Sequence, residues 1–311
     1  MKEKSIISKI KHSESGLTWI NISNPDLKSV EYLKKTYKFH ELDLEDCLSK
    51  AQRPKIDDYE DYLFLVLHLP YKTSRKNRIK SAELDVFIGQ DFVVTLHNSH
   101  PELNNLHEEL SKNKEQKEEY MGKGAGYFLY MLIDNVFDAS TPILDDLNKQ
   151  LDELERDVFE SDQSKDRLKD ILMLKKDIIN YRRIIMPERA ILAQLEHKNK
   201  KFLPEDLNVY FDDIVDKVEK MWNTLENLQE LIDSLQETNE SIISHTTNNV
   251  IKILTIFSVV MLPLTFVTGF YGMNINGLPL AQHPLSTVFV AGFMGLVVIS
   301  MIGYFRYKKW L

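Results

Sequence analysis

The sequence has very little cysteine: Cys47 is the only one in 311 residues. This excludes a disulfide framework and a multi-cysteine zinc site, and it is typical of a reducing compartment. The chain also lacks a basic excess, because 39 Lys and Arg stand against 47 Asp and Glu. A nucleic acid is therefore not expected as a main partner, since phosphate binding requires a basic face. No apolar run follows Met1–Lys4, so no cleavable signal peptide is predicted.

The end of the chain lacks charge almost entirely. From residue 253 onward the only charged residues are Arg306, Lys308 and Lys309. Two uncharged apolar runs, 253–270 and 288–305, are as long as a bilayer requires. Two buried helices of a soluble core are the alternative, but such helices rarely run through five turns without one charged residue. The sequence therefore predicts transmembrane helix 1 over 253–270 and transmembrane helix 2 over 288–305.

Basic residues flank the two runs at one side only. Lys252 precedes the first run, and the basic C-terminus 306–311 follows the second, whereas the loop 271–287 has no Lys, Arg, Asp or Glu. The positive-inside rule then places both termini in the cytoplasm and the loop outside. An aromatic belt at the inner interface is expected from Tyr304, Tyr307 and Trp310. The prediction is a multi-pass protein of the cell membrane, in contact with membrane lipid.

The first 125 residues are predicted to form a cytoplasmic α/β domain. Short β-branched or aromatic runs bounded by turn residues predict strands at 17–22, 62–69, 84–88 and 92–97. Helices are expected near 25–35 and 41–49. From about residue 126 helical periodicity replaces the strand pattern, over 127–161 and 165–194. We expect a cytoplasmic helical hairpin across 126–203.

A long helix is predicted from Pro204, as a stalk over 204–252 that passes directly into the first span. Pro204 suits a first helical turn, and no Gly or Pro follows it before Pro263. Apolar residues recur there as an unbroken heptad seam: Ile214, Val218, Met221, Leu225, Leu228, Ile232 and Leu235. By itself the seam fits an intramolecular helical hairpin or a dimeric coiled coil at least as well. The continuity with the membrane helix favours a stalk.

Two apolar helices cannot enclose a water-filled path alone, so a conduit would need several subunits. One face of the first span is smaller and more polar than the rest and is a candidate pore lining: Asn248, Ile251, Thr255, Ser258, Leu262, Thr265 and Gly269. Small and hydroxyl residues in membrane helices more often mark helix packing than a pore. The face alone therefore leaves both interpretations open.

The outer end of the first span carries a short motif, Tyr-Gly-Met-Asn at 271–274. It is accompanied by Leu-Pro-Leu-Thr-Phe at 262–266 and Lys-Lys-Trp-Leu at 308–311, and upstream by segments 18–21, 44–46 and 52–55. Together these motifs resemble the CorA family of magnesium channels over essentially the whole chain. The resemblance implies a funnel-shaped homopentamer with an α/β cytoplasmic domain, a long stalk helix and two C-terminal transmembrane helices. It also implies a channel for Mg²⁺ influx, lined by the first span, and not an enzyme.

The resemblance identifies the selectivity filter with Tyr271, Gly272, Met273 and Asn274. Mg²⁺ releases its octahedral water shell reluctantly, and a ring of neutral Asn274 amides can hydrogen-bond to those waters without removing them. The alternative is that Gly and Asn merely form a turn after a helix. Asn248 and Leu262 match pore-lining positions of the family, Leu262 in a hydrophobic constriction. An inside-negative potential favours entry of a dication by about 4.6 kcal/mol per 100 mV, so no nucleotide is required.

The resemblance also carries a regulatory metal site in the cytoplasmic domain. Asp46 and Asp213 match family carboxylates that bind a regulatory Mg²⁺ between neighbouring subunits, and Glu45 and Asp212 are candidate additional ligands. Two carboxylates across an interface repel each other until a divalent ion bridges them, so falling cytosolic Mg²⁺ would release the stalks. Without the resemblance, each of these residues is most simply a solvated charge on a helix surface.

Other functions stay open at this point. The loop 275–284 contains no carboxylate, unlike the acidic loop of many family members, so the rank order among Mg²⁺, Co²⁺ and Ni²⁺ is not fixed. A zinc- or cobalt-handling relative of the same fold is one alternative, with His283 at the mouth, although Met273 favours magnesium. A membrane-tethered coiled-coil Mg²⁺ sensor without transport is the alternative outside transport. Enzyme motifs are lacking: the glycine-rich stretch 122–126 does not have the spacing of a phosphate-binding loop.

Overall fold

The structure is a computed structural model, which describes residues 5–49, 52–73, 78–98, 100–160, 164–198, 200–274, 278 and 284–310. The chain divides into two compact units, Met1–Gln236 and Glu237–Leu311. One helix, α8 (Asn208–Tyr271), crosses the boundary between these units.

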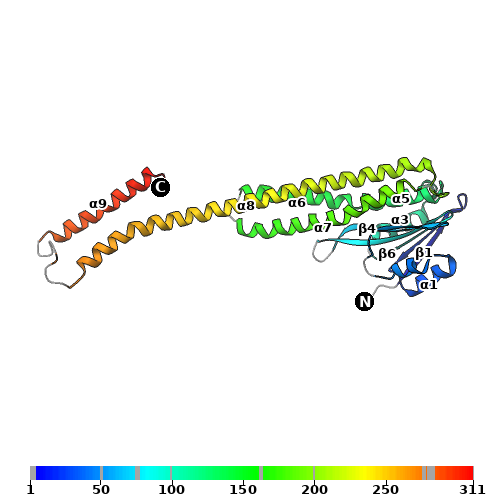
Figure 1. Ribbon diagram of the computed structural model, residues 1–311, viewed down its shortest axis with the longest axis horizontal. Coiled ribbons are helices and arrows are strands. Elements are labelled where there is room, and N and C mark those ends of the chain that lie inside the picture. The colour runs from blue at the N-terminus through cyan, green and yellow to red at the C-terminus, as the bar shows by residue number, and fades with distance from the viewer. Residues whose placement is uncertain are drawn as a thin grey trace. The chain divides into compact units, whose positions relative to one another are not determined.

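Unit 1 is built on a six-stranded mixed sheet with the order β1-β2-β6-β5-β4-β3 (Figure 1). The strands are β1 (Ile6–Lys11), β2 (Thr18–Ser23), β3 (Lys55–Asp58), β4 (Tyr62–Lys72), β5 (Ile79–Gly89) and β6 (Phe92–His97). Strands β2 and β6 pair in parallel, and the other neighbours are antiparallel. The four predicted strands correspond to β2, β4, β5 and β6, whereas the two edge strands lie outside the sequence prediction.

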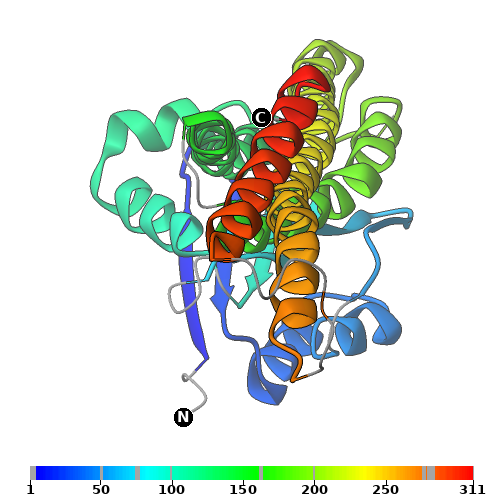
Figure 2. The ribbon, with the colours of Figure 1, turned by 90° about the vertical axis from the view of Figure 1, so that its left-hand side faces the viewer.

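Both faces of the sheet are buried. Up to residue 138, the helices of unit 1 are α1 (Leu27–Thr36), α2 (Glu41–Asp46), α3 (Pro101–Lys112), α4 (Lys114–Met121) and α5 (Ala125–Asp138). On one face, Phe64 of β4 joins Leu33 of α1 and Leu44 of α2 in a single core cluster. Leu65, the next residue of β4, is fully buried and points to the opposite face because side chains alternate along a strand. That face is covered by α3, α5 and α7 (Ser164–Glu196), on the side of the sheet away from α1 (Figure 2).

Local sequence explains why α1 and α2 form and where they end. The Asp26 carboxylate accepts the backbone N–H of Ser29 at 2.9 Å, and the Ser29 hydroxyl accepts the N–H of Asp26 at 2.8 Å, which is a capping box. Lys34 and Lys35 complement the helix dipole in its last turn. Helix α2 is only six residues long and ends at Asp46, so this carboxylate stands at a helix terminus.

The helical part of unit 1 differs from the prediction at two places. The block predicted over 127–161 is two helices, α5 and α6 (Thr141–Glu160), because Pro142 lies in the first turn of α6, where a missing N–H costs nothing. Pro204 does not open the long helix. It is extended, with φ −70° and ψ 158°, and precedes a 3₁₀ turn, so that α8 begins at Asn208.

The predicted heptad seam of α8 packs inside the chain. All seven of its residues, from Ile214 to Leu235, are buried within unit 1. Helix α7 (Ser164–Glu196) lies beside this part of α8 (Figure 1), and three ion pairs connect the two helices. They are Lys175–Asp233 at 2.7 Å, Arg182–Glu226 at 3.5 Å and Arg189–Glu219 at 2.6 Å, an antiparallel ladder with a step of seven residues on each helix. Of the alternatives for the seam, the intramolecular helical hairpin is the one that the structure shows.

This packing makes a stability prediction. Leu225 is fully buried in the seam, and truncating a buried leucine to alanine costs about 2–5 kcal/mol of unfolding free energy through lost burial and the cavity that remains. We therefore expect Leu225→Ala to lower the thermal unfolding midpoint of the purified protein clearly. Asn223→Ala, an exposed position of the same helix, serves as the control and should have little effect. Equal midpoints for both variants would contradict the observed packing.

Within the part of unit 2 that the structure describes, two helices are long and apolar enough to cross a membrane, the later part of α8 and α9 (Ser286–Tyr307). Helix α8 continues through Pro263 to Tyr271. Beyond α9 the chain turns back at Lys309, whose φ is +56°, and the Trp310 ring stacks on Phe305 with centroids 5.9 Å apart. The Lys252 ammonium donates a hydrogen bond to the carbonyl of Lys309 at 3.3 Å. The start of the first apolar run and the end of the second therefore lie together.

Candidate functional site

The candidate pore face of α8 is largely uncovered within the chain. Leu262 is 71% exposed and Ile251 54% exposed, and Asn248, Ser258, Thr265 and Gly269 are also exposed. The hydroxyl of Thr265 donates a hydrogen bond to the carbonyl of Met261, so the donor of this side chain is satisfied within the helix. This face is thus free to meet other copies of the chain or an aqueous path.

Thr255 differs from the other residues of this face. It is half-buried and borders a groove of about 470 Å³ together with Ser300, Tyr304 and Trp310 of the C-terminal segment. Its hydroxyl donates to the carbonyl of Ile251 at 2.8 Å. Thr255 therefore contributes to packing between the two apolar helices of unit 2.

The candidate filter begins where α8 ends. Tyr271 is the last helical residue, and the N–H of Gly272 closes a final turn onto the carbonyl of Thr268 at 2.9 Å. A Cβ at Gly272 would lie 3.0 Å from that same oxygen, so the tight turn favours glycine. Met273 is 48% exposed, and Asn274 is exposed directly after the turn. Residues 275–277 and 279–283, with His283, lie outside the described residues.

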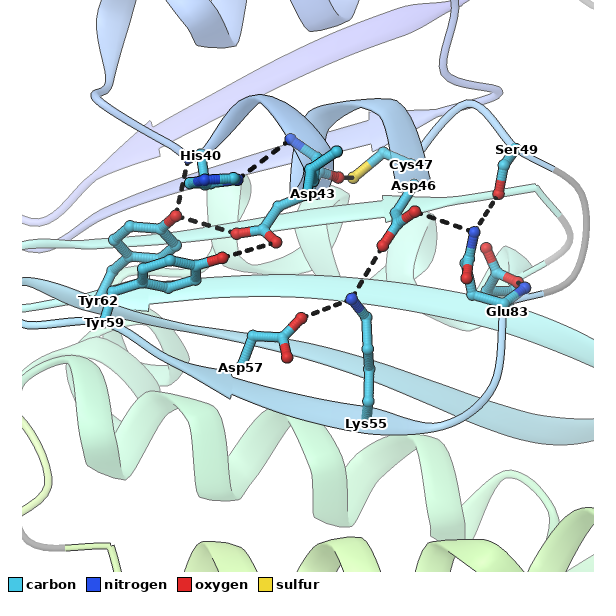
Figure 3. A network of polar contacts seen from close by, with 12 residues as sticks. His40, Asp43, Asp46, Cys47, Ser49, Lys55, Asp57, Tyr59, Tyr62 and Glu83 are labelled. Atoms are coloured by element: carbon cyan, nitrogen blue, oxygen red, sulfur yellow. Dashed lines mark hydrogen bonds and ion pairs between the residues drawn. The ribbon is translucent and has the colours of Figure 1, made fainter.

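Asp46 is the best-defined member of the candidate regulatory site (Figure 3). Its Oδ1 accepts a hydrogen bond from Nε2 of Gln52 at 3.0 Å, and its Oδ2 pairs with the ammonium of Lys55 at 2.8 Å. Lys55 also bonds Oδ2 of Asp57 at 2.5 Å, so that two carboxylates share one ammonium. Burial alone would lower the pKa of Lys55, but the hydrogen bonds to Asp46 and Asp57 outweigh it and raise the pKa. Lys55 therefore stays charged.

A buried polar layer supports α2 from beneath. Asp43 accepts the hydroxyl groups of Tyr59 at 3.0 Å and Tyr62 at 2.9 Å, and the thiol of Cys47 donates to the Asp43 carbonyl at 3.1 Å. Burial raises the pKa of Asp43, and the two tyrosine hydrogen bonds partly offset this effect. These contacts fix α2 on the sheet and thereby fix the backbone that carries Asp46. Neither this layer nor the pairing of Lys55 with Asp46 is apparent from the sequence, since both depend on residues that only the fold brings together.

The other three candidate ligands lie at surfaces. Glu45, Asp212 and Asp213 are exposed, and Asp213 is close enough to Tyr130 for its charge to contribute, after burial and Asp134, to the raised pKa of that phenol. Among the described residues of a single chain, no group of three or more His, Cys, Asp or Glu side chains is arranged to hold a metal ion.

Comparison with known proteins agrees with this organisation. The family model described as CorA-like Mg²⁺ transporter protein matches residues 14–309. The cobalt/magnesium transport protein CorA of Thermotoga maritima is 29% identical, over 94% of this chain and 83% of that protein. The zinc transport protein ZntB of Yersinia pseudotuberculosis is 20% identical, over 94% and 88%. The CorA magnesium transporter of Methanocaldococcus jannaschii has a solved structure with a TM-score of 0.83, 22% identity, and coverage of 97% and 94%.

The fold and the sequence therefore lead to one assignment. The six-stranded α/β unit, the long helix and the two apolar C-terminal helices are present together, and the family match extends over nearly the whole chain. The chain belongs to the CorA family of divalent metal ion transporters.

Proposed function

We propose that this transporter is a magnesium channel, formed by five copies of the chain around one pore. The observation that carries the proposal is the uncharged apolar later part of α8, followed directly by Gly272-Met273-Asn274, in a chain that belongs to a divalent metal ion transporter family. Five α8 helices would present their exposed Asn248–Gly269 faces to the pore, with Leu262 as an apolar constriction that closes by dewetting.

The proposed filter works on the hydrated ion. The Asn274 amides, repeated around the axis, would accept hydrogen bonds from the waters bound to Mg²⁺ and orient them. Because Mg²⁺ exchanges these waters slowly, a filter that binds the hydrated ion avoids removing them. Neutral amides bind the dication weakly enough for it to leave, which conduction requires. An inside-negative membrane potential supplies the driving force, about 4.6 kcal/mol per 100 mV for two charges. Both termini lie in the cytoplasm in this proposal.

The proposed gate responds to cytosolic Mg²⁺. Asp46 of one subunit and Asp213 of its neighbour would share a Mg²⁺ ion, with Glu45 and Asp212 as additional ligands. The exposure of Asp213 and the lack of a complete metal cluster among the described residues of one chain support a shared site. When Mg²⁺ is bound, the subunits are held together and the pore is closed. When it is lost, carboxylate repulsion allows the α8 helices to separate.

The test is ion uptake by the purified protein in liposomes loaded with a Mg²⁺-sensitive dye. We expect a Mg²⁺ signal that becomes faster when an inside-negative potential is imposed, because the potential drives dication entry. Light scattering of the same preparation in detergent should give the mass of five chains. A stable dimer, or liposomes that contain the protein but admit no Mg²⁺, would favour the membrane-tethered sensor instead.

Zinc is the second candidate cargo. The similarity to ZntB and the presence of His283 in the loop sequence favour it, whereas Met273 in the tripeptide favours magnesium. The same liposomes loaded with a Zn²⁺-sensitive dye distinguish the two. A zinc signal without a magnesium signal would replace the magnesium assignment and leave the family assignment intact.

A further inference from the structure

Both carboxylate oxygens of Asp46 already accept a hydrogen bond. Gln52 occupies Oδ1 and Lys55 occupies Oδ2, at 3.0 and 2.8 Å. The Asp46 side chain is 25% exposed, so an ion from solution can reach it. Any Mg²⁺ that binds Asp46, directly or through its water shell, must therefore displace or share one of these two partners. Lys55 is the charged one.

The contacts of the Lys55 side chain hold it in one position. It rises from β3 between Asp46 and Asp57 (Figure 3), and only 31% of its side chain is exposed. Its ammonium also lies 5.2 Å from the centre of the Phe64 ring, a cation–π contact. The positive charge is thus positioned where a dication would have to sit on this side of Asp46.

Asp57 makes an exchange feasible. Because Lys55 is already bonded to Asp57 at 2.5 Å, an ammonium displaced from Asp46 keeps one carboxylate partner and is not left unpaired. Displacing Lys55 from Asp46 therefore costs the free energy of one partly exposed ion pair, about 1 kcal/mol or less. A sensor needs a competitor of this modest strength, since every further 1.4 kcal/mol would raise the required Mg²⁺ concentration about tenfold.

We propose that Lys55 is a tethered competitor of Mg²⁺ at Asp46, which sets the cytosolic Mg²⁺ concentration at which the channel closes. This inference rests on the proposed function, in which Asp46 is a regulatory ligand. With Mg²⁺ absent, Lys55 pairs with Asp46 and orients it, and because the same ammonium is shared with Asp57, the two carboxylates keep a net negative charge. With Mg²⁺ present, the dication takes Oδ2 and the ammonium moves to Asp57. Lys55 is a positioning residue, since it acts through Asp46 and does not contact the transported ion.

The test compares inhibition of uptake by internal Mg²⁺ in variants of the full-length protein in liposomes. Lys55→Met keeps the length of the side chain and removes the charge, so the half-inhibitory Mg²⁺ concentration should fall, by about threefold to fivefold for one partly exposed ion pair. Asp57→Asn removes the alternative partner of Lys55, so the half-inhibitory concentration should rise. A purely structural Lys55 predicts the opposite for Lys55→Met, a weakened inhibition, because Asp46 would lose its orientation.

Three controls make the result specific. Lys55→Arg keeps the charge and should stay near the unmodified curve, and Lys34→Met removes an exposed lysine paired with Glu41 on the same unit and should not shift it. In an Asp46→Asn background the effect of Lys55→Met should disappear, because there is no carboxylate to compete for. Protection from trypsin by Mg²⁺ supplies a second readout, and it should move to lower Mg²⁺ in Lys55→Met.

The outcomes distinguish the competitor role of Lys55 from the regulatory site at Asp46. If Asp46→Asn weakens inhibition but Lys55→Met leaves the half-inhibitory concentration unchanged or raises it, the competitor role is wrong while the regulatory site stands. If Asp46→Asn leaves inhibition intact, the proposed gate itself is wrong. If Lys55→Met still lowers the half-inhibitory Mg²⁺ concentration in the Asp46→Asn background, the competitor role is also wrong.

Discussion

Replacing Asn274 by alanine should abolish the Mg²⁺ current. In the proposed filter every subunit contributes one amide to the water shell of the entering ion, so the single substitution removes five hydrogen-bonding groups at once. A hydrogen bond to a charged group contributes about 1.5–3 kcal/mol. The loss of even one such interaction would slow entry about tenfold, and the loss of the ring more than that. Dye-loaded liposomes under an imposed potential measure the effect as an initial rate of Mg²⁺ uptake.

The matched control for this substitution is Asn276→Ala, which removes an amide two residues further along the sequence. We expect it to transport at a rate close to that of the unmodified protein. Both variants should retain the mass of the assembly, so that a lost pore is not confused with a lost oligomer. Uptake by Asn274→Ala at the unmodified rate would show that the ion does not meet this side chain, and the filter would have to be sought elsewhere.

Reversing the charge of Asp213 should make the channel insensitive to internal Mg²⁺. Asp213 is exposed near the beginning of α8, and in the proposed assembly it completes the site of Asp46 on the next subunit. In Asp213→Lys each of the five interfaces would lose a carboxylate ligand and gain a cation that repels Mg²⁺. We expect the half-inhibitory Mg²⁺ concentration to rise by more than about tenfold, which corresponds to only 1.4 kcal/mol per ion.

Asp216→Lys is the control for this experiment. It makes the same change of charge three residues further along the exposed surface of α8. Its inhibition curve should stay near that of the unmodified protein. If Asp213→Lys gives an unchanged curve, or if both variants shift equally, inhibition does not depend on a shared site at this position.

The sequence predicts much of this fold because its main signals are local. Uncharged runs identify α9 and the later part of α8 without reference to any other segment. The inner strands β4 and β6 are rich in β-branched and aromatic residues, so their own composition identifies them. The edge strand β3 gives no such signal. In β3, Lys-Ile-Asp-Asp, three of the four residues are charged, and the segment is a strand because it pairs with β4.

The candidate site was predictable only in part for a related reason. Asp46 and Asp213 come from short motifs that can be read in the sequence, but the partners of Asp46 come from a loop and a strand brought back to α2 by the fold. The alternation of strand side chains places Lys55 and Asp57 on one side of β3, a signal that becomes meaningful only once β3 is known to be a strand. The heptad seam was ambiguous because periodicity shows which face is buried and not which helix covers it.

The ladder between α7 and α8 has a consequence for how these helices find their alignment. Acidic residues recur at every seventh position of α8, at 212, 219, 226, 233 and 240, whereas α7 offers cations at 175, 182 and 189. Sliding one helix by a heptad, about 10.5 Å, in either direction again sets three cations opposite three carboxylates. Charge complementarity is thus degenerate. The Trp222 ring distinguishes the observed alignment, because only there does it lie between two arginines, 4.8 Å from the Arg182 guanidinium and 5.0 Å from that of Arg189. A shift by one heptad would place it between Lys175 and Arg182 or between Arg189 and Glu196.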